Sequence, residues 1–393
     1  MAKAPIRLGR WLHTGWDMIG ITALLIITVE FISLGLLSLL DTDPRQRDFR
    51  LDSDAYAGAP WVVGYFEEDA NLRAQWDPYT YWKMAPFDGR YIHIDDEGRR
   101  QTVLPAEADG PTIFMFGGST MWGTGSRDAY TIPSQVAAAL SRQGVRANVV
   151  NFGEIGYVST QEVLSLMLEL REGNVPDVVV FYDGINDVTS AIHNRVAGIP
   201  HNEYRRHAEF NLLSRHRTRD YNREFVIRWI NDSATVRIVR ALLYRIGPGE
   251  TIARVEPVEN RTDPDLTAGV ANAYVKNIEI VQMLANQYGF ATLFYLQPVI
   301  FDKTVLSPYE AMQLEAATPY REFFESCYGE IAEKTRHVAG FRDISGILAA
   351  HEEPCFLDFM HVDEQANGLV ADAIARDLIP ALQTDTSRGS DGH

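Results

Sequence analysis

The stretch Thr112-Ile113-Phe114-Met115-Phe116-Gly117-Gly118-Ser119-Thr120 decides the fold of this chain. Its first five residues predict a short buried strand. The two glycines that follow permit a tight turn and let a ligand approach the backbone closely. Ser119 therefore stands at the carboxyl end of a strand, where its hydroxyl is placed for chemistry, and its neighbours Gly118 and Thr120 are expected to contact the ligand.

Strand and helix patterns alternate from this stretch to the end of the chain. Short apolar runs predict strands at residues 112–116, 147–150, 178–182 and 291–295, with a fifth starting near Gly340. Helical patterns lie between and after them, at residues 132–142, 160–171, 264–288 and 364–382. The alternation predicts an α/β fold of three layers, α/β/α, around a parallel, flavodoxin-like, five-stranded sheet. Ligands of such sheets bind at the carboxyl ends of the strands.

A second informative segment, Asp358-Phe359-Met360-His361, follows Ser119 by about 240 residues. A serine hydroxyl is a weak nucleophile, so acyl transfer needs a histidine to take its proton and a carboxylate to orient that histidine. The spacing lets Asp358 face Nδ1 of His361 while Nε2 points outward to Ser119. Taken alone, this pattern is more often a surface salt bridge, and an isolated Gly-Gly-Ser-Thr is usually a simple turn.

Two further segments supply donors for the oxyanion that forms during acyl transfer. Gly156 lies five residues after Asn151, in the loop behind the second strand, and offers an unshielded backbone N–H. Asn186 follows the third strand within Gly184-Ile185-Asn186-Asp187 and offers a neutral side-chain amide. Asp187, beside it, is expected to contact the substrate.

In their order, these four blocks resemble the SGNH hydrolases, the superfamily of GDSL esterases and lipases. Ser119, Gly156, Asn186 and His361 match the four residues for which that superfamily is named, within about residues 110–380. One position departs from the pattern, because Gly118 stands where the GDSL motif has Asp. The Gly-Gly-Ser form resembles that of relatives in envelope polysaccharide pathways, so we expect the chemistry to be intact.

The resemblance implies roles for the site residues. Ser119, His361 and Asp358 would be nucleophile, base and orienting carboxylate, and the Ser119 N–H, Gly156 and Asn186 would form the oxyanion hole. The implied activity is that of a serine esterase or acyl hydrolase, which acts through an acyl-enzyme on O-acyl esters, acetyl esters foremost, of an envelope or extracellular carbohydrate.

Two alternatives stay open at this stage. An O-acyltransferase to a glycan acceptor would use the same residues, since nothing in the sequence separates water from a sugar hydroxyl as the acceptor. A catalytically silent, membrane-tethered glycan-binding protein would keep the fold without turnover. The expected ligand in all three cases is a small-molecule or glycan ester, or the glycan itself.

Composition and motifs argue against other classes of function. A formal net charge of -17 disfavours nucleic acid as a partner, because phosphate binding relies on clustered Lys and Arg. The glycine loop lacks the Lys of a P-loop, and the dinucleotide fingerprint is missing from it. The histidines do not have metal-ligand spacing such as H-E-x-x-H, so we expect neither a metal nor a cofactor.

Residues 19–40 form an apolar stretch interrupted only by Glu30. As a helix it would be about 33 Å long, enough to cross a hydrocarbon core of about 30 Å. No small-x-small cleavage site precedes Asp41, so the stretch predicts an uncleaved signal anchor. Glu30 marks a possible contact with another membrane protein, although a protonated side chain without a specific partner fits as well.

Basic residues flank the stretch on both sides. The basic residues before it are Lys3, Arg7 and Arg10. Several aspartates lie among the basic residues after it and reduce the net positive charge there. We therefore expect a single-pass protein of the bacterial inner membrane, with the N-terminus inside and the catalytic domain in the periplasm or outside the cell.

The predicted organisation divides the chain into five parts. These are a cytoplasmic segment (1–18), the anchor (19–40), a tether and domain-covering extension (41–110), the hydrolase domain (111–383) and a disordered tail (384–393). An insertion at 188–263 is locally basic and rich in His, which suits a substrate-selecting lid as well as a core-covering helical segment. Cys327 and Cys355 could pair in an oxidising compartment or remain as two buried thiols.

Overall fold

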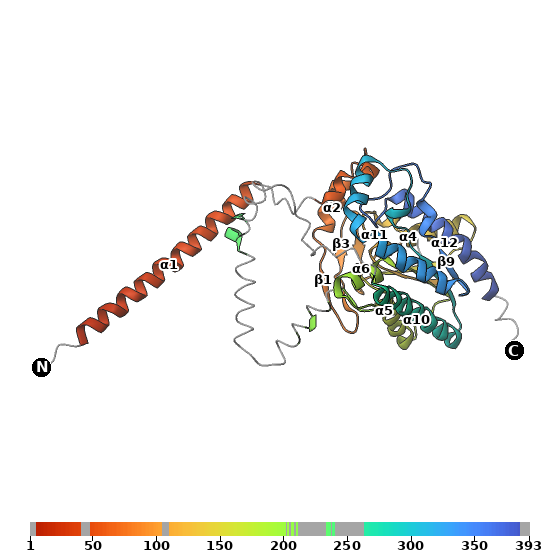
Figure 1. Ribbon diagram of the computed structural model, residues 1–393, viewed down its shortest axis with the longest axis horizontal. Helices are drawn as coiled ribbons and strands as arrows, with labels where there is room; N and C mark the ends of the chain where they lie inside the picture. The colour runs from red at the N-terminus through yellow and green to blue at the C-terminus, as the bar shows by residue number, and fades with distance from the viewer. Residues whose placement is uncertain are drawn as a thin grey trace. The chain divides into compact units, whose positions relative to one another are not determined.

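The computed structural model describes residues 5–40, 48–103, 110–201 and 263–385, together with positions 203, 206, 207, 210, 233–236, 238 and 239. The chain divides into two compact units. One consists of Met1–Asp48 with Arg206–Val255, and the other of Phe49–Arg205 with Glu256–His393. Most of the predicted insertion and of the predicted tail lies outside the described residues (Figure 1).

A parallel five-stranded sheet forms the centre of the second unit. Its strands lie in the order β6-β5-β7-β8-β9, which places the first strand of the alternating series between the second and the third. Their bounds are Thr112–Gly117 (β5), Asn148–Gly153 (β6), Val178–Asp183 (β7), Ala291–Leu296 (β8) and Phe341–Asp343 (β9). This is the flavodoxin-like order, and the predicted fold class is confirmed.

Helices cover both faces of this sheet, so the unit has three layers (Figure 1). One face packs on a core that α5, α6, α10 and α11 close, with bounds Ser159–Glu172, Ile185–Asn194, Pro264–Tyr288 and Pro308–Thr335. The other face packs against α4 (Ile132–Arg142) and α12 (Glu364–Asp385). The central strands β5 and β7 are buried on both sides, which explains why they are continuous apolar runs without alternation.

Two elements differ from the sequence-based expectation. Helix α11 was not predicted, because its apolar positions are irregular and Pro319 lies inside it. Its start does carry a readable signal, since Ser307 and Glu310 form a capping box around Pro308. Helix α6 continues to Asn194 and packs in the core, at residues where we expected the insertion to begin.

The segment before the first sheet strand forms a small cap on the domain. It contains α2 (Val62–Asp69) and two hairpin-like pairs, β1 (Ala74–Asp77) with β2 (Tyr81–Met84) and β3 (Phe87–Asp88) with β4 (His93–Ile94). Its aromatic side chains pack with Trp122 and Leu357 from the domain. Near Gly98, an isolated antiparallel bridge pairs Ile94 with Arg100.

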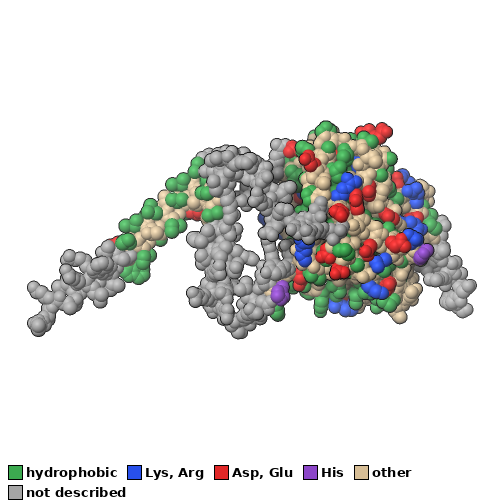
Figure 2. Space-filling view, in the orientation of Figure 1, with side chains coloured by type: hydrophobic (Ala, Val, Ile, Leu, Met, Phe, Trp, Pro, Cys, Tyr) green, Lys and Arg blue, Asp and Glu red, His purple; other side chains and the backbone are tan. Residues whose placement is uncertain are grey.

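The N-terminal unit is dominated by helix α1 (Pro5–Leu40). Residues Trp16–Leu36 are long and apolar enough to cross a membrane, with a mean hydropathy of 2.2. Large apolar side chains such as Trp16, Leu24 and Phe31 are exposed along it (Figure 2). In water this exposure would be costly, whereas in a bilayer it costs nothing.

Glu30 has partners within its own unit. Its carboxylate accepts hydrogen bonds from the Ala234 N–H, from the Thr235 N–H at 3.2 Å and from the Thr235 hydroxyl at 2.8 Å. Ser33, one turn further on, lies 3.2 Å from the same hydroxyl. A segment of the predicted insertion thus binds the polar positions of α1, while a contact of Glu30 with another membrane protein stays a prediction.

Candidate active site

Ser119 begins the short helix α3 (Ser119–Trp122), directly after strand β5. Gly117 and Gly118 make this sharp turn possible. A Cβ at Gly117 would lie 2.5 Å from the Tyr182 carbonyl oxygen and 2.6 Å from Met121 Cβ, so no larger residue fits there. The serine is 7% exposed, which leaves its hydroxyl at the carboxyl edge of the sheet and largely shielded from water.

The predicted nucleophile, base and carboxylate form one continuous hydrogen-bonded chain. Ser119 Oγ lies 2.7 Å from His361 Nε2, and His361 Nδ1 lies 2.7 Å from Asp358 Oδ2. Because Asp358 accepts from Nδ1–H, Nε2 is left without a proton and accepts from the serine hydroxyl. This is the arrangement in which a histidine can act as the general base for a serine.

Asp358 is held in its charged form. Burial disfavours the carboxylate, but His361 and the hydrogen bonds outweigh burial and lower the pKa of Asp358 to about 2. Its second oxygen, Oδ1, accepts from the Met360 and His361 N–H groups at 2.9 and 2.8 Å. The same carboxylate therefore closes the turn that carries His361 and orients its ring.

A buried ion pair supports the chain leading to Asp358. Lys303 Nζ lies 2.7 Å from Glu310 Oε1, and both side chains are almost fully buried. Glu310 Oε1 also accepts from the Cys355 and Phe356 N–H groups at 2.9 and 3.0 Å. Lys303 adds a bond to the Glu353 carbonyl at 2.7 Å. Sequence reasoning missed the support that Glu310 gives to this segment, since nothing local connects residue 310 with residue 355.

Asn186 lies next to the turn that carries Ser119. A Cβ placed on Gly118 would be 2.1 Å from Asn186 Nδ2, so the amide occupies the space that any larger residue at 118 would need. At Gly118, a larger residue would therefore have to displace this amide. The contact also puts a neutral N–H donor beside the nucleophile's backbone, where an oxyanion would form.

Gly156 lies in the loop between β6 and α5 with φ +79°, a conformation that favours glycine. An added Cβ would make ordinary van der Waals contacts without a clash, at 3.6 Å from Trp82 Cζ2 and 3.9 Å from His201 Cδ2. Burial lowers the pKa of His201 to about 4, so this ring is neutral near pH 7. The role of the Gly156 N–H as an oxyanion donor stays a prediction.

Asp187 has buried partners within the domain, and the substrate contact that we predicted for it stays a prediction. It is 2% exposed, and its carboxylate accepts from the Ser159 hydroxyl at 2.6 Å and the Ser159 N–H at 3.2 Å. Burial and the charge of Asp183 raise the pKa of Asp187 to about 7. Asp187 ties the start of α6 to the start of α5, below the loop that bears Gly156.

The loop after the nucleophile is held by a buried arginine that the sequence did not single out. Arg100 donates to Asp128 at 2.9 Å, to the Gly123 carbonyl at 2.7 Å and to the Ser126 carbonyl at 2.5 Å. Its guanidinium also lies 4.3 Å from the centre of the Trp122 ring. This network fixes the end of α3 and with it the position of Ser119.

The remaining expectations for the site have mixed outcomes. Thr120 is 7% exposed, and its Oγ1 has no partner among the described residues, so its contact with substrate stays a prediction together with that of Gly118.

Cys327 and Cys355 are buried free thiols, the second of the two alternatives considered above. Within the described part of the chain, no three His, Cys, Asp or Glu side chains group as metal ligands would.

Comparisons with known proteins find similarity only to solved structures. No protein-family model matches the chain, and no curated protein matches it. An acetyl xylan esterase is 13% identical, with 68% of this chain and 98% of that chain covered and a TM-score of 0.34. A carbohydrate acetylesterase from Sinorhizobium meliloti is 14% identical, with 69% and 99% covered and a TM-score of 0.36.

A third similar structure is that of a protein assigned to the G-D-S-L family of lipolytic proteins, from Desulfitobacterium hafniense DCB-2. It is 8% identical, with 68% of this chain and 99% of that chain covered and a TM-score of 0.34. At these identities and scores, the similarity carries no inference about the activity or the substrate of this chain.

Proposed function

We propose that the protein is a serine esterase that removes acyl groups, acetyl foremost, from carbohydrate esters outside the cytoplasm. The observation that carries the proposal is the hydrogen-bonded chain from Ser119 through His361 to Asp358, with both links at 2.7 Å. A buried serine, an imidazole in reach and an ionised carboxylate behind it supply the three groups that nucleophilic acyl transfer needs.

Turnover proceeds in two steps. His361 Nε2 takes the proton of Ser119 while the serine oxygen bonds to the ester carbonyl carbon. The tetrahedral oxyanion accepts from the Ser119 N–H, the Gly156 N–H and the Asn186 amide. The carbon–oxygen bond to the sugar then breaks, and His361 returns its proton to the leaving hydroxyl. A water attacks the acyl-enzyme in the same way and releases the free acid.

The acceptor in the second step decides the outcome of the reaction. If a sugar hydroxyl replaces water in the second step, the same residues carry out O-acyl transfer. The two outcomes differ in their products, so product analysis distinguishes them.

Helix α1 supports a proposal for where the reaction takes place. We propose a single-pass protein of the bacterial inner membrane, with the N-terminus in the cytoplasm and the catalytic unit in the periplasm. The apolar span Trp16–Leu36 supports insertion, and Lys3, Arg7 and Arg10 before it support this orientation. Carbohydrate esters of the envelope would then be within reach of the site.

Hydrolysis of p-nitrophenyl acetate by the full-length protein in detergent tests the activity. We expect turnover by the wild type and a loss of at least about 10⁴-fold in kcat for Ser119→Ala. Ser141→Ala, on the far end of α4, is the matched control and should retain wild-type kcat. Equal rates for wild type and Ser119→Ala would refute the assignment. Addition of oligosaccharides, followed by mass spectrometry of the products, reports transfer.

A further inference from the structure

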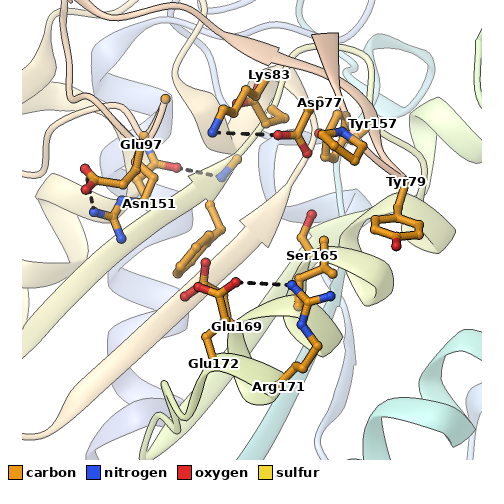
Figure 3. Close-up of a pocket in the computed structure, with 17 residues that line it drawn as sticks. Asp77, Tyr79, Lys83, Glu97, Asn151, Tyr157, Ser165, Glu169, Arg171 and Glu172 are labelled. Carbon is orange, nitrogen blue, oxygen red and sulfur yellow. Dashed lines mark hydrogen bonds and ion pairs between the residues drawn. The ribbon is translucent and has the colours of Figure 1, made fainter.

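A cavity of about 370 Å³ has a lining that includes none of Ser119, His361 and Asp358 (Figure 3). Its walls come from three places in the chain: the outer strand β6 with the residues after it, one face of α5, and the β1–β2 hairpin. The turn that contains Glu97 and Arg99 closes one side. The cavity has no part in the acyl-transfer chemistry described above.

Charged side chains of both signs line this cavity, and carboxylates are in excess by five to three. Each of the three cations lies near a carboxylate. The pairs are Lys83 with Asp77 at 3.7 Å, Arg99 with Glu97 at 3.2 Å, and Arg171 with Glu172 at 3.2 Å. An anionic ligand would have to displace these carboxylates, so the lining disfavours uronic acids and phosphates.

Glu154 is the unusual member of the lining. It is 8% exposed, its Oε1 accepts from the Met84 N–H at 3.3 Å, and its Oε2 has no hydrogen-bond partner among the described residues. Burial raises the pKa of Glu154 to about 8, so the group is a neutral acid near pH 7. An unpartnered buried carboxyl costs free energy, which a hydroxyl-bearing ligand or a water in the cavity offsets.

Tyr79 gives the cavity an aromatic edge. It lies at the tip of the β1–β2 hairpin, is 68% exposed, and has φ +71°, which is uncommon for a residue other than glycine. Figure 3 shows its ring at one edge of the labelled residues, with Glu97 and Asn151 at the other. An exposed ring beside paired carboxylates and cations suits a sugar, whose C–H face packs on aromatics and whose hydroxyls bond to charged groups.

We propose that this cavity is a binding subsite for a neutral oligosaccharide, which holds the glycan while an ester elsewhere on it enters the active site. The proposal deepens the proposed function and rests on it for the link to catalysis. It names neutral glycans as the substrate class.

The same loop connects the subsite with the oxyanion hole. Trp82 Nε1, on the hairpin, donates to the Ile155 carbonyl at 2.9 Å, and the Tyr157 hydroxyl donates to the Trp82 carbonyl. Gly156 lies between these two anchored residues. A glycan that fixes the hairpin therefore also fixes the backbone that presents the Gly156 N–H.

A glycan array with neutral, uronic-acid and amino-sugar oligosaccharides tests the subsite. The probe is full-length Ser119→Ala protein in detergent, which binds without turnover. We expect retention on neutral oligosaccharides, and titration calorimetry with the strongest of them should give a Kd that Tyr79→Ala weakens at least about tenfold. Tyr79→Phe, which keeps the ring, should restore binding, and Tyr288→Ala, an exposed tyrosine outside the cavity, should bind like the parent.

Two kinds of result overturn the subsite. One is that the array retains the protein only on acidic or amino-sugar oligosaccharides, or on no oligosaccharide at all. The other is equal binding by the parent and Tyr79→Ala. The p-nitrophenyl acetate assay separates this failure from that of the proposed function. Hydrolysis by the wild type without neutral-glycan binding refutes the subsite alone, and glycan binding without hydrolysis refutes the esterase and leaves the subsite standing.

Discussion

The side-chain amide of Asn186 occupies the space above Gly118, since a Cβ on that glycine would lie 2.1 Å from Asn186 Nδ2. Two of the four sequence blocks are thus fitted to each other through one contact. The glycine that departs from the GDSL pattern is the residue that lets the proposed oxyanion donor reach the nucleophile's turn.

This contact predicts a strong interaction between two substitutions. Gly118→Ala should push the amide away and lower kcat for p-nitrophenyl acetate by about 10²-fold or more, as Asn186→Ala should by removing the donor. In the Asn186→Ala background the added methyl meets no Nδ2, so Gly118→Ala should then have a much smaller effect. Steady-state kinetics of the four proteins measure this cycle. Gly329→Ala, a helical glycine with open space, is the control.

Additive losses in the double variant would contradict the contact. They would mean that Gly118 acts on catalysis by another route, such as strain in the turn that carries Ser119.

The buried pair of Lys303 and Glu310 predicts a large effect on stability. Glu310→Ala leaves an unpaired lysine and two unbonded N–H groups at Cys355 and Phe356, which should cost about 3–5 kcal/mol of unfolding free energy. Urea unfolding followed by tryptophan fluorescence gives the value. Glu279→Ala, which breaks an exposed pair with Lys276, should cost less than about 1 kcal/mol. A similar small change for both would show that the pair does not support the loop before Asp358.

Glu154 predicts a pH dependence of stability. Its raised pKa of about 8 means that the folded protein keeps a proton that the unfolded chain loses near pH 4.5. Between these values, rising pH therefore lowers the stability of the wild type relative to Glu154→Gln, by at most about 1.4 kcal/mol per pH unit. Unfolding curves of both proteins from pH 5 to pH 8 measure the difference. A constant difference over that range would show that Glu154 is ionised throughout.

The contact between Glu30 and residues 234–235 predicts a cross-link. Ser33 Oγ and Thr235 Oγ1 lie 3.2 Å apart, so Ser33→Cys with Thr235→Cys should form a disulfide under mild oxidation. Proteolysis between the two positions and non-reducing electrophoresis would reveal it. Glu30→Ala should reduce the yield, because it removes three hydrogen bonds to this segment. A yield no higher than that of Gly35→Cys with Thr235→Cys would argue against the contact.

Much of this architecture could be predicted from local patterns. The strand before Ser119 is a continuous apolar run, because parallel strands are buried on both faces. The turn with Asp358 and His361 is also local, since three residues suffice to bring the carboxylate to Nδ1. The predicted fold class followed from the alternation of such runs with helices, and the structure confirms it.

The supporting groups could not be predicted in this way. Arg100 and Asp128, or Glu310 and Cys355, meet only because the fold brings distant segments together. The contact of Asp187 with Ser159 could not be predicted for the same reason, because the two residues lie 28 positions apart. Helix α11 had a readable start at Ser307, but its irregular apolar positions concealed its length.

Covalent labelling tests the central claim most directly. A fluorophosphonate should react with the folded wild-type protein, and tryptic mass spectrometry should place the phosphonyl group on Ser119, with labelling abolished in Ser119→Ala and strongly slowed in His361→Ala. A probe that leaves Ser119 unmodified in folded protein, or one that labels wild type and Ser119→Ala alike, would contradict the account.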